Sequence, residues 1–426
     1  MGIRVGAVFA KAVQTAVVRV FAILTSFLVT ILATRGLGAE QAGYFLLGFT
    51  LVTALSTFLR LGLDNVLVRA FGADGMSKEP LNTFAYALRW AAVVACAAGV
   101  LGCVFSSAIA LHVFGKPEFA DALFWMMLAL PLVVLFNLCS FAFQGLHRVV
   151  AATWFQQLGA GFVFVLLFAL VWWQQPSWLS SGNAALLFFV AALLVSVMAV
   201  VLWMRQKESS IPALGGKWKN AELWESSSNL WAAASMSLLV QWSGVLIAGA
   251  LIASSELAHL SAAQRTANIT SFVLMVVNMA VAPRYARLWK EQKLDELRQL
   301  ARISTRAMIA MVLPVVAIML VFPGFILGLF GEGFEQGALL LSIMAIGQFI
   351  NVATGSVGYL LNMSGHEKDM RRVTMFAGPL TIILAFVLTS EFGAVGAAAA
   401  TAIGVSVQNL GALAMVKRRL GFWPIG

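Results

Sequence analysis

Long apolar runs, separated by short polar or charged segments, recur along the whole 426-residue chain. A helix that crosses the hydrocarbon core of a bilayer needs about 20 mainly apolar residues. Runs of about that length lie at residues 13–34, 42–63, 86–111, 122–143, 151–173, 184–204, 229–253, 258–282, 306–330, 337–361, 373–390 and 394–416. The pattern therefore predicts an all-α integral membrane protein with 12 transmembrane helices.

Short strings repeat weakly between the first six runs and the last six. EQAGY at 40–44 parallels ELAHL at 256–260, and QGLHR at 144–148 parallels SGHEK at 364–368, at offsets of 216 and 220 residues. Because six crossings return the chain to its starting side, such a repeat is parallel and its pseudo-twofold axis runs along the membrane normal. We expect two six-helix lobes, residues 1–206 and 229–426, a cytoplasmic linker at 207–228, and a substrate cavity between the lobes.

Composition agrees with a membrane protein and excludes a soluble globular enzyme. Hydrophobic residues make up 61% of the chain and charged residues 11%, whereas soluble domains carry about 25% charged residues. The net charge is +10, but the basic residues lie in clusters between the apolar runs. A nucleic-acid-binding protein gathers them in one patch or stripe, so we expect no nucleic-acid partner.

The basic clusters predict the orientation, because short loops rich in Lys and Arg stay in the cytoplasm. If the N-terminus is cytoplasmic, 22 of the 28 basic residues lie in cytoplasmic segments, and the outside segments contain only Arg35 and Lys116. Both termini are therefore predicted to be cytoplasmic. The other four basic residues, Arg19, Arg60, Arg89 and Arg265, lie within the runs.

Polar side chains recur at helical spacing within five of the runs, and a polar residue in a membrane helix normally faces other protein or water. These stripes are Thr15, Arg19, Ser26 and Thr30; Thr53, Thr57, Arg60 and Asp64; Ser237, Gln241 and Gly244; Ser261, Arg265, Asn268, Ser271, Met275 and Asn278; and Gln348, Asn351, Gly355 and Asn362. Packing between helices explains an uncharged stripe equally well. Packing explains an arginine deep within a membrane span less well, and of the four arginines Arg265 lies farthest from the ends of its run.

Guanidinium groups match the oxygens of phosphate and carboxylate, so arginines in a cavity favour an anionic substrate. An alternative role for Arg60 is an ion pair with Asp64, four residues further along the helix. The candidate substrate-binding residues are Arg19, Arg60, Arg265, Gln241, Gln264, Asn268, Asn278, Gln348 and Asn351.

Catalytic and metal-binding patterns are missing from the sequence. The four histidines, His112, His147, His259 and His366, are dispersed without the spacing of metal ligands. A membrane polymerase, ligase or glycosyltransferase generally needs a sizeable outside loop, and the predicted outside loops are short. We therefore expect no enzymatic activity, no cofactor and no metal site.

The segment at residues 284–306 has the pattern of an amphipathic helix. The charged residues lie opposite one broad apolar face, which Tyr285, Leu288, Trp289, Leu297, Leu300 and Ile303 can share. Such a helix lies in the membrane interface, with its apolar face in the lipid and its basic face toward anionic headgroups. We expect one interfacial helix here, anchored to membrane lipid.

Several strings resemble those of a known family, the polysaccharide transporters (Wzx-like oligosaccharide flippases). They are AEQAGYF from Ala39, LGLDNVLVR from Leu61, AVAPRYARL from Ala280, LFGEGF from Leu329 and FGAVGAA from Phe392. That family belongs to the superfamily that also contains MATE multidrug exporters and lipid II flippases. The resemblance covers essentially the whole chain, and its loose, glycine-rich motifs indicate the superfamily better than the substrate.

The resemblance implies two rocking lobes with a central cavity lined by the first, second, seventh and eighth helices. Lipid II flippases hold pyrophosphate with arginines on the first, second and eighth helices, where Arg19, Arg60 and Arg265 lie here. The two additional helices of lipid II flippases and the acidic cavity residues of multidrug exporters have no counterpart in this sequence.

The expected function is therefore a flippase in the bacterial inner membrane. It would move an undecaprenyl-diphosphate-linked oligosaccharide for O-antigen, capsule or exopolysaccharide assembly, with a polysaccharide polymerase as a candidate partner. A MATE-like small-molecule exporter and a lipid II flippase are the alternatives.

Overall fold

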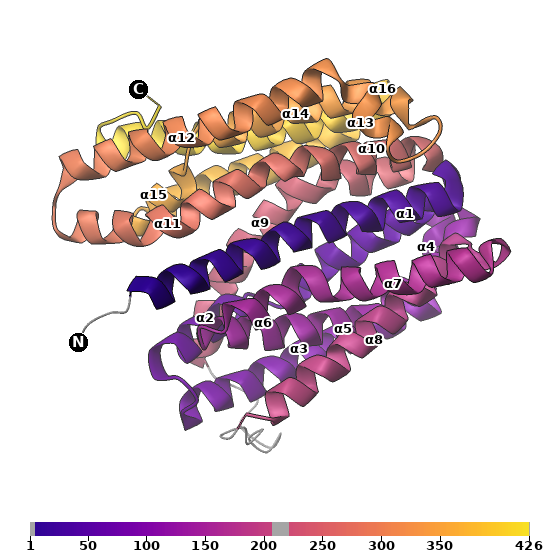
Figure 1. Cartoon of the computed structure of the whole chain (residues 1–426), viewed down its shortest axis with the longest axis horizontal. Coiled ribbons are helices and arrows are strands. Elements are labelled where there is room, and N and C mark those ends of the chain that lie inside the picture. Colours follow the sequence, from indigo (N-terminus) through magenta and orange to yellow (C-terminus); the bar gives the residue numbers. More distant parts are fainter. Residues whose placement is uncertain (1–4, 207–220, 426) are drawn as a thin grey trace. The chain divides into compact units, whose positions relative to one another are not determined.

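Helices dominate the part of the chain that the computed structural model describes, residues 5–206 and 221–425. Figure 1 shows their course, and contacts divide the chain into two compact units, Met1–Ser235 (unit 1) and Met236–Gly426 (unit 2). The helices of unit 1 are α1 (Val5–Leu59), α2 (Leu63–Asp74), α3 (Lys78–Val104), α4 (Ser106–His112), η1 (Pro117–Phe119), α5 (Ala120–Gly145), α6 (Val149–Thr153), the π-helix η2 (Trp154–Leu158), α7 (Gly159–Gln174), η3 (Pro176–Trp178) and α8 (Ser181–Met204).

Helix α9 (Ala221–Leu251) leads from unit 1 into unit 2. Unit 2 continues with α10 (Ser254–Ala267), η4 (Asn268–Thr270), α11 (Ser271–Lys290), α12 (Leu294–Val321), α13 (Pro323–Gly328), η5 (Phe334–Gly337), α14 (Ala338–Ala353), α15 (Val357–Met363) and α16 (Glu367–Leu420). In Figure 1 the turn between α11 and α12 lies at the same end of unit 2 as α15 and the C-terminus, and α10 and α13 lie at the other end.

Eight helices in the described parts of the chain are long and apolar enough to cross a membrane. The all-α membrane fold is thus observed, whereas the count of 12 spans and the pseudo-twofold axis remain predictions. The predicted linker, residues 207–228, lies partly outside the described residues, and its last residues belong to α9, which begins at Ala221. The predicted domain boundaries likewise remain a prediction.

Two of the long helices each contain two predicted spans. In α1 only Gly38 leaves the helical conformation (φ 75°, ψ 168°), and in α16 only Gly393 does so (φ 57°, ψ −136°). Positive φ at these ψ values is accessible essentially to glycine alone. The short loops expected around residues 35–41 and 391–393 are therefore single-residue breaks between two helices.

Unit 1 is organised around a buried tryptophan. Trp203 on α8 is 2% exposed, and its ring centroid lies 5.6 Å from that of Phe71 (α2), 4.5 Å from Phe84 (α3) and 5.6 Å from Phe143 (α5). Aromatic side chains bury about 150–250 Å² each and favour tilted or edge-to-face contacts. This cluster packs four helices together at one level.

The segment at residues 284–306 corrects one prediction. It is not a single interfacial helix, because α11 runs to Lys290, residues 291–293 form a turn with Gln292 at φ 56°, and α12 begins at Leu294. The apolar positions of both helices instead pack into a core with α15 and α16, which includes Tyr285, Leu297 and Ala301.

Candidate functional site

The most polar predicted span, residues 258–282, does not form one continuous α-helix. Helix α10 ends at Ala267, a 3₁₀ turn covers Asn268–Thr270, and α11 begins at Ser271. A stretch of 3₁₀ helix inside a longer helix often marks a hinge or a functional position. Two polar residues of the predicted stripe lie here: Asn268 is the first residue of this turn, and Ser271 directly follows it.

Gln348 on α14 connects both of them through its side-chain amide. Its Oε1 accepts hydrogen bonds from Ser271 Oγ (2.9 Å) and Asn351 Nδ2 (3.0 Å), and its Nε2 donates to Asn268 Oδ1 (3.0 Å). We call these four residues the amide network. Three of the predicted site residues, Asn268, Gln348 and Asn351, are therefore in one hydrogen-bonded group.

The amide network offers neutral donors and acceptors at one place. An Asn or Gln side chain can both donate and accept, as a sugar hydroxyl can. The side chains of Asn268, Ser271 and Asn351 are half-buried, so each keeps part of its surface accessible. Helices α11 and α14 contain no acidic residue in their sequences.

A pocket beside the network is too small for a sugar. It is lined by Gln264, Asn268, Gln348 and Thr401 among others and has a volume of about 10 Å³. A cavity needs about 10–15 Å³ to hold one water molecule. The pocket therefore has room for about one water molecule.

Gln264 and Gln241 form a second polar contact within unit 2. Gln264, 4% exposed, donates from Nε2 to the backbone oxygen of Gln241 at 2.7 Å, and the Gln241 side chain is exposed. Gln264 thus ties α10 to α9, while Gln241 keeps its own amide accessible.

Arg265 occupies α10 one turn before Asn268, and its side chain is half-buried. The acidic residue of α10, Glu256, is nine residues away, about 14 Å along the helix. Because a guanidinium stays charged in proteins, α10 places a positive charge within about one helical turn of the amide network.

Asn278 lies apart from this group. It is seven residues beyond Ser271 on α11, about 10 Å along the helix, and it is 6% exposed. Its Oδ1 has no hydrogen-bond partner among the described residues. Of the nine predicted site residues, this one has an unsatisfied buried oxygen.

The predicted residues of unit 1 differ in environment from those of unit 2. Arg60 follows the end of α1, is 7% exposed, donates from a terminal guanidinium nitrogen to Thr57 Oγ1 (3.2 Å), and has Nε 3.5 Å from Asp64 Oδ2. Its guanidinium carbon lies 5.3 Å from the centroid of the Phe141 ring. This is the ion pair that the sequence offered as an alternative. Arg19 belongs to α1, and its side chain lies outside the described residues.

Two residues that contact the candidate site were not predicted from the sequence. Phe141 stacks on Arg60, and Thr401 of α16 lines the small pocket. An isolated threonine in the alanine-rich string AAAATAIG was the available signal for Thr401. Nothing in the local sequence pairs Phe141 with an arginine 81 positions earlier in the chain.

Two family models match the chain. The model described as "Polysaccharide biosynthesis protein" covers residues 8–289, and the model described as MatE covers residues 232–387. A curated relative, the probable low-salt glycan biosynthesis flippase Agl15 of Haloferax volcanii, is 28% identical over 173 residues. That match covers 40% of this chain and 36% of the relative, so the chain aligns with about a third of that protein.

Solved structures share the fold at low identity. An inward-facing MATE multidrug resistance transporter matches with a TM-score of 0.77 and 14% identity over 96% of this chain and 98% of that one. The lipid II flippase MurJ in an inward closed conformation matches with a TM-score of 0.73 and 12% identity, over 95% of this chain and 87% of that one. A MOP superfamily transporter from Pyrococcus furiosus matches with a TM-score of 0.64 and 14% identity, over 96% of this chain and 94% of that one.

Proposed function

The chain belongs to the polysaccharide biosynthesis protein family, and from that premise we propose that it is a flippase for a lipid-linked oligosaccharide. The substrate we propose is an undecaprenyl-diphosphate-linked oligosaccharide of O-antigen, capsule or exopolysaccharide assembly. It would move by alternating access from the cytoplasmic to the outer leaflet of a bacterial inner membrane. The likeness to a glycan biosynthesis flippase supports this proposal.

The observation that carries the proposal is the amide network beside Arg265. A diphosphate-linked sugar has an anionic group next to hydroxyl groups, and α10 carries Arg265 one helical turn before the neutral amides of η4 and α14. Charge-assisted hydrogen bonds from arginine suit phosphate oxygens. Asn and Gln side chains suit hydroxyl groups.

We assign roles on this basis. Within unit 2, Arg265 neutralises the diphosphate, and Gln241, Asn268, Asn278, Gln348 and Asn351 bind sugar hydroxyls. The resemblance to lipid II flippases extends the phosphate role to Arg19. Arg60 and Gln264 contribute by positioning, because Arg60 is balanced by Asp64 and Gln264 holds α9 against α10. The polyprenyl tail stays in the bilayer.

Replacing Arg265 tests the proposal. In a strain without its chromosomal copy, Arg265→Ala should lower surface glycan by about 10- to 100-fold, the effect of losing one or more charge-assisted hydrogen bonds. Arg265→Lys keeps the charge and should retain part of the export. Arg306→Ala, at an exposed position of α12, serves as the matched control and should export normally.

Immunoblots of the membrane fraction must show equal amounts of each variant. Normal glycan export by Arg265→Ala at an equal amount of protein would contradict the assigned role.

A small-molecule exporter is the second candidate, favoured by the MatE match at residues 232–387. Drug susceptibility of the deletion strain separates the two functions. A flippase predicts lost surface glycan with unchanged drug susceptibility, whereas an exporter predicts the reverse.

A further inference from the structure

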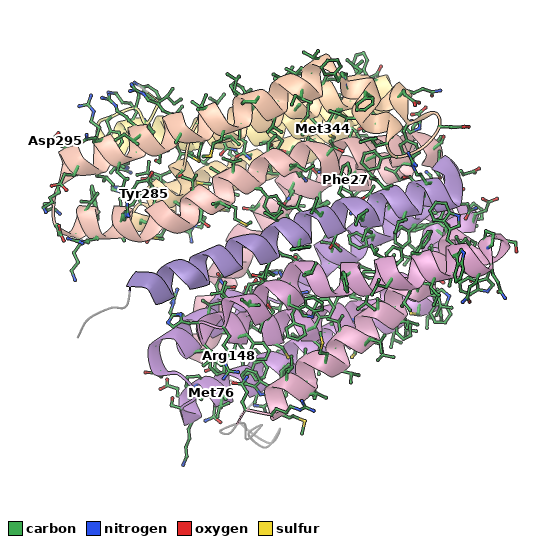
Figure 2. The ribbon with its side chains drawn as sticks, in the orientation of Figure 1. Phe27, Met76, Arg148, Tyr285, Asp295 and Met344 are labelled. Atoms are coloured by element: carbon green, nitrogen blue, oxygen red, sulfur yellow. The ribbon has the colours of Figure 1, made fainter. Side chains whose placement is uncertain are left out.

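The hairpin between α11 and α12 is the most basic part of unit 2 outside the site described above. Residues 284–306 contain seven basic and three acidic residues, a net charge of +4. Figure 2 labels Tyr285 on α11 and Asp295 near the start of α12 at this end of the unit. The charge is concentrated where two helices meet.

The uncharged stretches on either side locate the hairpin relative to the bilayer. No charged residue occurs at 266–283 before Arg284, or at 307–321 after Arg306. Charged residues at the ends of such stretches lie at the level of the lipid headgroups, where Lys and Arg are common. The hairpin is therefore placed at the headgroup level of one leaflet.

A buried hydrogen bond joins the two helices at this level. Tyr285, 1% exposed, lies with its hydroxyl 2.9 Å from Ser304 Oγ. Arg284 and Ile303, the residues before these two, are both exposed and therefore lie at the same level, outside the core.

The two helices border an open hollow of about 540 Å³, within the range of about 300–1,000 Å³ that is typical of ligand pockets. The basic lining residues are Arg284, Arg287 and Lys293, and the apolar ones are Leu288, Leu300 and Ile303. Glu291, Glu296 and Gln299 complete the lining. The hollow therefore has both a polar and an apolar wall.

Ion pairs hold two of the three cations in place. Glu291 accepts from Arg287 Nε at 2.7 Å and lies 3.1 Å from Lys293 Nζ. Hydrogen bonds from these two cations lower the pKa of Glu291, so this carboxylate stays ionised at neutral pH. Arg284 takes part in no ion pair among the described residues, which leaves its charge for a ligand.

The apolar wall continues toward the bilayer. Ile303 is 57% exposed, and Met311 two turns further along α12 is 48% exposed. On α11, Val276 is 49% exposed two turns before Arg284. Both helices thus present apolar side chains on the bilayer side of the hollow, where an acyl chain can pack.

We propose that this hollow binds the phosphate headgroup of an acidic membrane phospholipid. Arg284 contacts the phosphate oxygens, since guanidinium groups suit phosphate. Arg287 and Lys293, which also line the hollow, contact them as well. The acyl chains lie against Ile303 and the exposed apolar face of α12. The site holds a lipid of the surrounding bilayer and does not depend on the proposed transport substrate.

Native mass spectrometry of the purified full-length protein, titrated with phosphatidylglycerol or phosphatidylcholine, tests the site. Wild type should bind phosphatidylglycerol more tightly than phosphatidylcholine. Arg284→Ala should weaken phosphatidylglycerol binding about fivefold, the effect of one basic residue near an anionic lipid surface. Ile303→Ser should weaken binding of both lipids.

Arg298→Ala is the matched control, because Arg298 is an exposed cation of the same segment that does not line the hollow. It should bind phosphatidylglycerol like wild type. An equal loss in Arg298→Ala and Arg284→Ala would show a diffuse basic surface and overturn the site. Competition by inorganic phosphate at the concentration of the lipid would overturn the lipid as its ligand.

Discussion

At the scale of single residues, Gln348 connects more of the candidate site than any of its neighbours. Its amide makes three hydrogen bonds, to Asn268, Ser271 and Asn351, which lie on different elements of unit 2. Removing this one side chain leaves several polar groups without their partner. A partly buried polar group without a partner costs more than the hydrogen bond itself contributes.

Gln348→Leu should therefore lower the free energy of unfolding by about 1–3 kcal/mol. Thermal unfolding of the purified protein in detergent, followed by tryptophan fluorescence, measures the change. Asn409→Leu is the control, since within the described part of the chain Asn409 Nδ2 donates to the backbone oxygen of Val405 in its own helix and to no other group. An equal loss of stability in both variants would argue against a cooperative network.

The sequence predicted which polar residues share a helical face, but it did not predict which of them contact one another. Helical spacing placed Arg265, Asn268 and Ser271 on one stripe and Gln348 and Asn351 on another. That the two stripes meet depends on how α14 packs against η4 and α11, which no local pattern encodes. For the same reason the sequence could offer an ion pair with Asp64 for Arg60 without excluding a role in binding.

At the scale of elements, the apolar runs predicted where helices lie but not where they break. Residues 258–282 contain a 3₁₀ turn at Asn268–Thr270, and residues 151–173 contain a π-helix at Trp154–Leu158. Neither stretch contains proline, so the amino-acid composition does not reveal where these two helices break. Gly38 and Gly393 mark the opposite case, in which an expected loop reduces to one residue.

The two ends of α16 are joined by an ion pair outside the apolar spans. Asp369, 5% exposed, accepts from Arg419 Nε at 2.6 Å and from Arg372 at 3.3 Å. Hydrogen bonds from Arg419 lower the pKa of Asp369 below its ordinary value. A lowered pKa means that the stabilisation is complete above the unfolded-state pKa, about 3.9, and is lost as the pH falls through the folded-state pKa.

Asp369→Asn should therefore unfold at a lower temperature than wild type at pH 7, and the difference should shrink as the pH falls below about 4. Thermal unfolding at a series of pH values measures it. Glu367→Gln, at an exposed position two residues earlier, should leave the transition unchanged. A difference between wild type and Asp369→Asn that stays constant with pH would exclude the ion pair as its cause.

At the scale of the whole molecule, the high apolar content and the clustered basic residues predicted a multi-pass membrane protein, and the all-α fold bears this out. The family match over residues 8–289 agrees with the resemblance drawn from short glycine-rich strings. The fold alone does not separate flippases from exporters, because both kinds of structure match at similar TM-scores of 0.73 and 0.77. The distinction therefore has to come from the substrate that is moved.

Direct translocation of a lipid-linked oligosaccharide tests the central proposal. The purified protein would be reconstituted into liposomes that carry undecaprenyl-diphosphate-linked oligosaccharide in both leaflets, with and without proton or sodium gradients. A membrane-impermeant glycosidase added outside then reports the fraction of substrate that has reached the outer leaflet. We predict that vesicles with the wild-type protein expose nearly all of the substrate, and that vesicles with Arg265→Ala or without protein expose about half. Equal exposure in all three, under every gradient, would contradict the proposed flippase.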